Sequence, residues 1–381
     1  MERCYNRAGK RAEQTQPMLS QQARKVSVII PTWKRGDLLR KCLESLRWQT
    51  FTDFKVVMVS NEAGEWADEL AREFGCELVR FSENRGFAAA VNAGIAASES
   101  PYLMVLNDDA ELHPAWLEQT VLLLEEQPEF SFCCGKIYKS DGRTIDDVGN
   151  AISMGGGAWR LGHGRADAPE FDGPRPLFAV TMTAAIFRRA VFEKIGSLDE
   201  NFISYLEDMD YSIRLWRAGL RGMYLPQAVA RHHGGASLEG DDARERFRLM
   251  TRNQLVLLAK HYPAALWFRL GVHIKWAQIL WFAMAVRRGL LGAYLAGVWQ
   301  YICLFPRIIR KRATWSEAER RAFVEWLRES EWAIYEDIFE RPRTEQDTYW
   351  RMYFALFRPR RSALATGISP VERGPEALRR R

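Results

Sequence analysis

A short apolar run that ends in an acidic cluster, residues 102–110 (YLMVLNDDA), most constrains the fold of this sequence. A continuous apolar run predicts a strand that is covered on both faces. Asn107, Asp108 and Asp109 then stand at its carboxyl end, the edge where open α/β sheets bind ligands. Adjacent carboxylates repel unless a cation lies between them, and a divalent ion that bridges to phosphates meets that need. A plain acidic turn is the alternative, since Asp favours turns.

The residues before this stretch alternate between two kinds of pattern. Apolar, β-branched runs at residues 26–30, 54–59 and 77–81 predict strands, and residues 38–46 and 66–74 have helical periodicity. Strands that alternate with helices imply right-handed crossovers and an α/β fold with a mainly parallel sheet.

The chain has 381 residues, more than one typical core, so we expect two units. We place a basic flexible tail at residues 1–24, an α/β domain at 25–240 and a helical region at 241–381. The tail has no apolar core, so it is not a secretory signal. The six cysteines have no C-x-x-C spacing, which favours a reducing compartment.

Several ordered motifs make the chain resemble glycosyltransferase family 2. They are VSVIIPTWKR, NRGFAAAVNAGIAAS and YLMVLNDDAELHPAWLE in the first half, and FEKIGSLDENFISYLEDMDYSIRLWRAG further on. The resemblance is closest to the bacterial rhamnosyltransferase-like and galactofuranosyltransferase-like branch. It implies a GT-A fold, a nucleotide-diphosphate-sugar donor and Mn²⁺ or Mg²⁺ as cofactor.

The resemblance also suggests roles for the residues around the first acidic cluster. Asn107-Asp108-Asp109 occupies the place of the family's D-x-D motif, so Asp109 would ligate the metal and Asp108 would help to hold the nucleotide sugar. Pro31 and Thr32 would line the base and ribose.

The donor side has two further candidates. Ser60 stands where the family usually has a base-contacting Asp, a departure for which Asn61 or Glu62 could substitute. Arg85 precedes the Ala-rich helix and is a candidate pyrophosphate contact, because a helix N-terminus offers free N–H groups. A surface arginine in a loop is the equal alternative.

The second acidic cluster contains Glu207 and Asp208 at the start of a helix. The helix dipole alone explains acids in a first turn. Sugar transfer with inversion, however, needs a carboxylate to take the proton of the attacking hydroxyl. By the resemblance, Asp208 is this general base and Glu207 positions the acceptor. The Q-x-x-R-W signature of processive synthases is absent from the sequence, so we expect one or a few sugars to be added.

A histidine pair followed by two glycines supplies the last site candidate. By the resemblance, His232 is a third protein ligand of the metal, and His233 is its reserve. An Asp and a His with open positions for phosphate oxygens suit Mn²⁺. The glycine-rich residues 153–164 lack the spacing of a phosphate-binding loop, and we interpret them as a flexible surface loop or a loop near the mouth of the site.

The C-terminal third is rich in tryptophan, phenylalanine and basic residues. Residues 264–286 combine aromatic residues with charges, which is typical of a helix lying in a membrane interface. Residues 289–305 carry no charge and are flanked by arginines on both sides. We therefore predict a peripheral protein on the inner, cytoplasmic face of the cell membrane, bound to an anionic surface. A buried helix or a dimer interface is the alternative.

Together these features predict an inverting, metal-dependent glycosyltransferase of cell-surface polysaccharide synthesis. It would use a UDP- or dTDP-sugar and a glycan or polyprenyl-linked acceptor. No nucleic-acid-binding module is recognisable, so we expect no nucleic acid partner. The alternatives are a catalytically inactive GT-A-like protein that binds glycan or nucleotide, a nucleotidyltransferase, and a membrane scaffold whose helical region is the working part.

Overall fold

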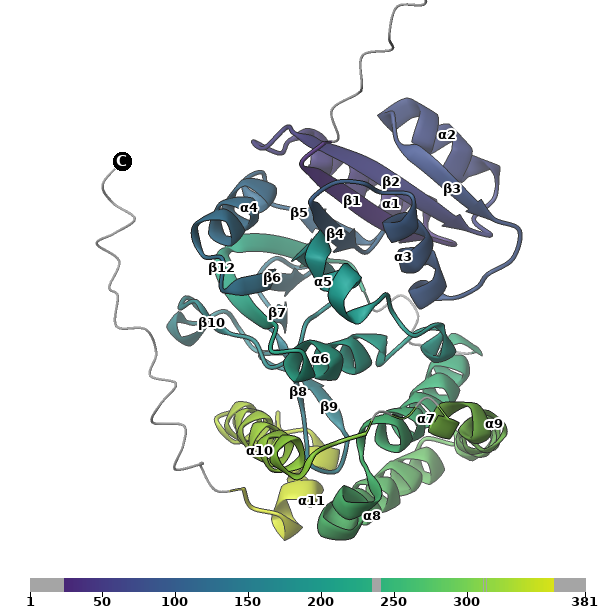
Figure 1. Ribbon diagram of the computed structural model, residues 1–381, viewed down its shortest axis with the longest axis vertical. Helices are drawn as coiled ribbons and strands as arrows, with labels where there is room; N and C mark the ends of the chain where they lie inside the picture. Colours follow the sequence, from purple (N-terminus) through teal and green to yellow (C-terminus); the bar gives the residue numbers. More distant parts are fainter. Residues whose placement is uncertain (1–23, 235–240, 311, 313, 360–381) are drawn as a thin grey trace, which may run out of the picture.

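The computed structural model describes residues 24–234, 241–310, 312 and 314–359. Its centre is a mixed sheet in the strand order β10-β12-β6-β11-β4-β1-β2-β3, with β5 paired to β12 and β7 paired to β6 (Figure 1). The strands are β1 (Val26–Thr32), β2 (Phe54–Asn61), β3 (Glu77–Phe81), β4 (Tyr102–Leu106), β5 (Ala110–Leu112), β6 (Phe130–Lys139), β7 (Ile145–Asp147), β10 (Arg175–Pro176), β11 (Ala184–Arg188) and β12 (Arg221–His232). A separate hairpin consists of β8 (Asn150–Ile152) and β9 (Ala158–Arg160).

Six helices cover the two faces of the sheet, because alternate strand residues point to opposite sides. On one face, Val28 and Ile30 pack in a core with α1 (Gly36–Arg47), α2 (Glu65–Phe74) and α4 (Trp116–Glu126). On the other, Ile29 and Val105 pack with α3 (Phe87–Ala96), α5 (Arg189–Ile195) and α6 (Glu207–Arg217). The 3₁₀ turns η1 (Pro169–Phe171) and η2 (Glu200–Phe202) lie in the connections. The predicted α/β fold is confirmed, with β11 running antiparallel between β4 and β6.

Strand register explains how the site residues come together. β1 is parallel to both β2 and β4, and Thr32 pairs with Ser60 at the carboxyl end of β1. At the same edge β12 pairs with β5, which sets His232 opposite Ala110 and beside Asp109. β12 continues through Pro226 with a register shift between Leu225 and Val229. Such a bulge accommodates a proline that cannot donate a ladder hydrogen bond.

The C-terminal helices form a layer below α6 and the β8–β9 hairpin (Figure 1). They are α7 (Asp241–His261), α8 (Ala264–Arg287), α9 (Leu291–Arg310), α10 (Glu317–Phe339) and α11 (Thr348–Leu356). A shared core joins Ile213 of α6 to α7, α8 and α10. The segment that we took for a flexible loop is instead inserted here: Ser153 to Gly157 are buried. Ile152 N donates to Ser330 Oγ at 2.7 Å, and Gly155 N donates to Tyr353 Oη at 3.1 Å.

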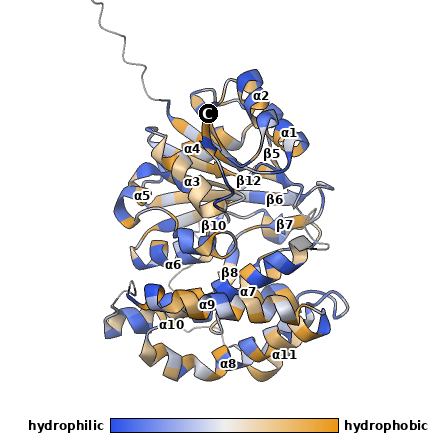
Figure 2. Cartoon of the chain, turned by 90° about the vertical axis from the view of Figure 1, so that its right-hand side faces the viewer, coloured by the Kyte–Doolittle hydropathy of each residue, from blue (hydrophilic) through white to orange (hydrophobic). Residues whose placement is uncertain are grey.

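Helices α8 and α9 are rich in hydrophobic residues (Figure 2), and many of their apolar residues are exposed. We define the α8–α9 face by its exposed apolar residues, among which the Phe268 side chain is 94% exposed and that of Trp299 66%. The others are Trp267, Val272, Ile279, Phe282, Val286, Leu291, Leu295, Ile302, Phe305 and Ile309. Among the described helices, none is both long enough and apolar enough to cross a bilayer.

Candidate active site

The carboxyl ends of β1 and β4 bring together the candidate donor-binding residues. Asp108 follows β4 and accepts a hydrogen bond from the Thr32 hydroxyl at 2.8 Å. Burial, followed by the charge of Asp109, raises the pKa of Asp108 to about 6. Asn107 Oδ1 is buried and lacks a hydrogen-bond partner within the described chain. Buried polar atoms without a partner are uncommon in folded proteins, so this oxygen stands out at the sheet edge.

Asp109 is the buried centre of an electrostatic cluster. One carboxylate oxygen contacts the Arg35 guanidinium, and the other lies 3.1 Å from His232 Nε2. Burial opposes ionisation of Asp109, but the hydrogen bond and charge of His232 and the charge of Arg35 outweigh it and lower its pKa. Burial likewise disfavours the charged form of His232, yet its bonds to Asp109 and to Asp146 raise its pKa to about 9. The cluster therefore has two carboxylates sharing one imidazole.

The donor set of this cluster fits a divalent cation. His232 Nδ1 lies 2.8 Å from Asp146 Oδ2, so that Nε2 is the ring nitrogen turned toward Asp109. A carboxylate behind the imidazole is the usual outer-shell arrangement of a metal-binding histidine. No ready-made group of three His, Cys, Asp or Glu ligands occurs among the described residues. Asp109 and His232 would thus provide two ligands, which suits an ion that also binds phosphate oxygens.

The second acidic cluster begins α6. Asp208 keeps part of its surface exposed, and its Oδ2 accepts a hydrogen bond from Asn150 Nδ2 at 3.1 Å. Burial raises the pKa of Asp208 to about 6. Glu207 is buried with Oε2 unpartnered among the described residues, and burial together with the Asp208 charge raises its pKa to about 8. A carboxylate whose pKa is brought near neutrality is suited to general base catalysis.

Hydrogen-bonded contacts from the first cluster reach Arg160, and the charge of Arg160 acts on the second cluster. Arg160 on β9 donates to both oxygens of Asp146, at 2.9 and 3.0 Å. The same guanidinium acts on Asp208, where its charge favours the ionised form and lowers the pKa against burial. Contacts therefore run from Asp109 through His232 and Asp146 to Arg160, and the charge of Arg160 extends to Asp208.

Other residues predicted from the sequence have structural partners. Asn61 is buried and holds the segment before α3, because its Oδ1 accepts from Arg85 N at 2.8 Å and its Nδ2 donates to Asn84 Oδ1 at 2.8 Å. The Arg85 guanidinium lies over the Phe81 ring, 4.6 Å from its centroid, and 3.4 Å from Glu200. Buried Ser60 accepts from Ala63 N at 3.3 Å, and Pro31 is buried in β1 beside Val59. Their roles toward a donor stay predictions.

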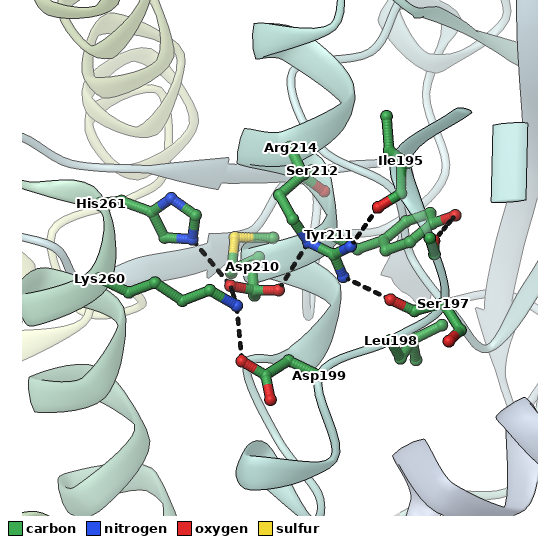
Figure 3. Close-up of polar contacts among 12 residues, drawn as sticks. Ile195, Ser197, Leu198, Asp199, Asp210, Tyr211, Ser212, Arg214, Lys260 and His261 are labelled. Carbon is green, nitrogen blue, oxygen red and sulfur yellow. Dashed lines mark hydrogen bonds and ion pairs between the residues drawn. The ribbon is translucent and has the colours of Figure 1, made fainter. Parts of the chain in front are cut away.

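Asp210, two residues after the proposed base, has a different surrounding. It is fully buried and lies 2.7 Å from both Lys260 Nζ and His261 Nε2 of α7, and 3.0 Å from Arg214 Nε (Figure 3). Burial opposes its ionisation, but the charge of Lys260, the hydrogen bond from His261 and the charge of Arg214 together lower its pKa. Asp210 is thus a charged anchor between α6 and α7. Arg214 serves this anchor and also binds the carbonyls of Ile195 and Ser197.

Sequence reasoning missed Asp146, Asn150 and the contact of Arg35 with Asp109. Asp146 and Asp147 lie within buried β7, and two adjacent acids in a strand were the available signal. Asp147 is fully enclosed with Oδ2 unpartnered in the described chain, and burial raises its pKa to about 6.

A mixed sheet flanked by helices, with acidic residues at the carboxyl ends of its parallel strands, is the architecture of the GT-A fold. A crystal structure of GalNAc-T7 with UDP, GalNAc and Mn²⁺ superposes with a TM-score of 0.53 at 14% identity, covering 69% of this chain and 52% of that one. At this level of identity the likeness concerns the fold.

Residues 27–196 match the model of the family described as glycosyl transferase family 2. This part of the chain is therefore a glycosyltransferase family 2 domain. It is 32% identical over 236 residues to the O-antigen biosynthesis protein RfbC of Myxococcus xanthus, a match of 57% of this chain but only 18% of that protein. It is 24% identical over 282 residues to the N-acetylglucosaminyl-diphospho-decaprenol L-rhamnosyltransferase of Mycobacterium tuberculosis, covering 67% of this chain and 87% of that enzyme.

Proposed function

We propose that the chain is an inverting, metal-dependent glycosyltransferase of cell-surface polysaccharide synthesis. The observation that carries this proposal is the line of contacts from Asp109 through His232 and Asp146 to Arg160, whose charge acts on Asp208. It supports a cation site formed by Asp109 and His232 in the same region as the Asp208 carboxylate, whose pKa is about 6. The proposed donor is a UDP- or dTDP-sugar and the acceptor a glycan or polyprenyl-linked sugar. The UDP in the GalNAc-T7 structure supports the donor class, and the diphospho-decaprenol acceptor in the name of the Mycobacterium tuberculosis enzyme supports the acceptor class.

The residues of the network have distinct proposed tasks. Thr32 and Asp108, together with the unpartnered Asn107 amide oxygen, orient the nucleotide. Asp109 and His232 would hold Mn²⁺ or Mg²⁺, which when bound neutralises charge on the leaving diphosphate. A carboxylate oxygen of Asp208 accepts the proton of the acceptor hydroxyl. At the same time the hydroxyl oxygen forms the new bond to the anomeric carbon. The bond from that carbon to the phosphate oxygen breaks on the opposite face, so configuration inverts.

The α8–α9 face supports a peripheral site of action. Its exposed aromatic and aliphatic side chains occur on the same two helices as Arg269, Lys275, Arg287 and Arg307. Apolar surface with basic neighbours is the composition of helices that lie in an anionic membrane interface. We propose that this face rests on the inner leaflet of the cell membrane, where a polyprenyl-linked acceptor would be presented.

The test of the proposed function measures release of nucleotide diphosphate from UDP-, dTDP- and GDP-sugars with Mn²⁺ and an acceptor. We expect wild-type release to fall by about 10²–10⁴-fold in Asp208→Asn. Asp53→Asn changes an exposed carboxylate that is distant in sequence from Asp208 and is the matched control. Its rate of release should stay near that of wild type. Release that is equal in Asp208→Asn and wild type would refute Asp208 as the base. Donor binding without release would favour the catalytically inactive alternative.

A further inference from the structure

The turn immediately before α6 has an unusual backbone. We call residues 203–206 the strained turn, because Ile203, Tyr205 and Leu206 have φ angles of 62°, 71° and 64°. Bulky residues rarely adopt positive φ. Such strain persists only where the surroundings impose it, and it gathers at functional sites. The strained turn leads directly into Glu207 and Asp208, so its conformation sets the direction of both carboxylates.

One buried side chain of α7 holds the strained turn from below. Asn253 Nδ2 lies 2.8 Å from the carbonyl oxygens of Phe202 and Ser204 and 2.7 Å from that of Tyr205. Its Oδ1 accepts from Arg252 Nε at 2.9 Å, which fixes the amide so that its NH₂ group faces the turn. Asn253 is fully buried. Three carbonyls converging on one amide are a costly arrangement to leave unsatisfied, so Asn253 dictates where these carbonyls point.

The strained turn is also held from the donor side. Ala88 N donates to the carbonyl of Ile203 at 3.0 Å, and Phe87 N donates to Ser204 Oγ at 3.2 Å. These amides belong to the first turn of α3, so two N–H groups that have no partner within the helix donate to the strained turn instead. Gly86 permits the approach, because a Cβ there would lie 2.5 Å from Ile203 Cγ2. The turn is therefore fixed between α3 and α7.

We infer that Asn253 is a positioning residue for the proposed general base, which it aims through the strained turn. This inference rests on the proposed function. Helix α7 makes a second attachment to α6, where Lys260 and His261 bind Asp210 (Figure 3). The two attachments flank Asp208 in sequence and fix the first turn of α6 against the C-terminal helices. The family match ends at residue 196, so the direction of the base is set by a helix outside that match.

The test compares Asn253→Leu, which removes both N–H donors, and the milder Asn253→Ser with Val256→Ala. Val256 is fully buried one turn along α7 and contributes only packing. The measurements are kcat, donor KM, Tm and hydrogen exchange of the amides of residues 203–209. We expect kcat to fall by about tenfold or more in Asn253→Leu, since a small misplacement of a reacting group has effects of this size. The serine variant should lie between it and wild type, with donor KM within about threefold.

The control separates positioning from general destabilisation. Val256→Ala should lower Tm while kcat below its unfolding range stays within about threefold of wild type. Equal losses of kcat in Val256→Ala and the Asn253 variants at matched Tm would overturn the inference. If wild type turns over no donor, the proposed function fails. Hydrogen exchange at residues 203–209 then tests by itself whether Asn253 holds the strained turn. Exchange no faster in Asn253→Leu than in Val256→Ala would overturn the role of Asn253 in holding the turn.

Discussion

The hydrogen bond from Asn150 to Asp208 makes a quantitative prediction about pH. Because Asp208 has a pKa of about 6, it is protonated and unable to act as a base below that pH. The rate should therefore fall as pH decreases through about 6. Asn150→Leu removes a donor 3.1 Å from Asp208 Oδ2 at similar side-chain volume. A hydrogen bond to a charged group contributes about 1.5 kcal/mol or more, and about 1.4 kcal/mol corresponds to one pKa unit.

The acid limb of the Asn150→Leu profile should accordingly move to higher pH by about one unit. The assay measures kcat/KM for the donor between pH 5 and pH 9 at saturating acceptor, with the rate monitored as release of nucleotide diphosphate. Because Glu207 interacts with Asp208, the observed midpoint belongs to the pair rather than to one residue. Asp208→Asn is the control, and its residual rate should lack the acid limb. A limb that is unmoved in Asn150→Leu, or retained in Asp208→Asn, would refute the assignment.

Three further predictions concern stability, metal and membrane. Glu207 has a pKa raised from 4.5 to about 8, so this residue ionises at lower pH in the unfolded chain than in the folded one. The free energy of unfolding should therefore fall by roughly 3 kcal/mol between pH 4.5 and pH 7. Chemical denaturation at several pH values should show a weaker pH dependence of this free energy in Glu207→Gln, and an unchanged pH dependence would contradict the prediction. Mn²⁺ with a donor nucleotide should raise Tm in wild type, and Asp109→Asn should lose most of the metal-dependent part; an equal shift in both would place the cation elsewhere. Phe268→Asp should lower binding to anionic vesicles by more than about tenfold in a flotation assay, because a side chain 94% exposed loses its apolar contact with lipid. Leu122→Asp on α4 is its control, and equal losses in both variants would argue against docking through the α8–α9 face.

The first half of the fold could be predicted because its signals are local. The runs that became β1, β2 and β4 are continuous and apolar, and the helices between them repeat every three to four residues. Asn107, Asp108 and Asp109 could be placed at the sheet edge for the same reason. The extent of β12 was harder, because Pro226 resembles a strand terminator until the bulge at residues 225–229 is seen.

The missed residues act over long separations in the sequence. Asp146 contributes through His232, 86 residues away, and Asn150 through Asp208, 58 residues away. Asn253 reaches back to residues 202–205, and no local pattern marks a buried asparagine in a helix as a clamp. The glycine-rich segment was misread for a related reason. Its composition is typical of loops, and only tertiary contacts with Ser330 and Tyr353 reveal that it is enclosed.

That enclosed segment has a consequence for how the protein can be divided. The amides of Ile152, Met154 and Gly155 find their acceptors on Ser330, Glu331 and Tyr353. A truncated chain ending near residue 240 would leave three N–H groups without their acceptors and the glycine-rich segment without the helices that it packs against. Exchanging the carboxyl-terminal helices between relatives would meet the same obstacle. Recombinant fragments and chimeras should therefore keep residues 150–160 and their helical cradle from a single parent.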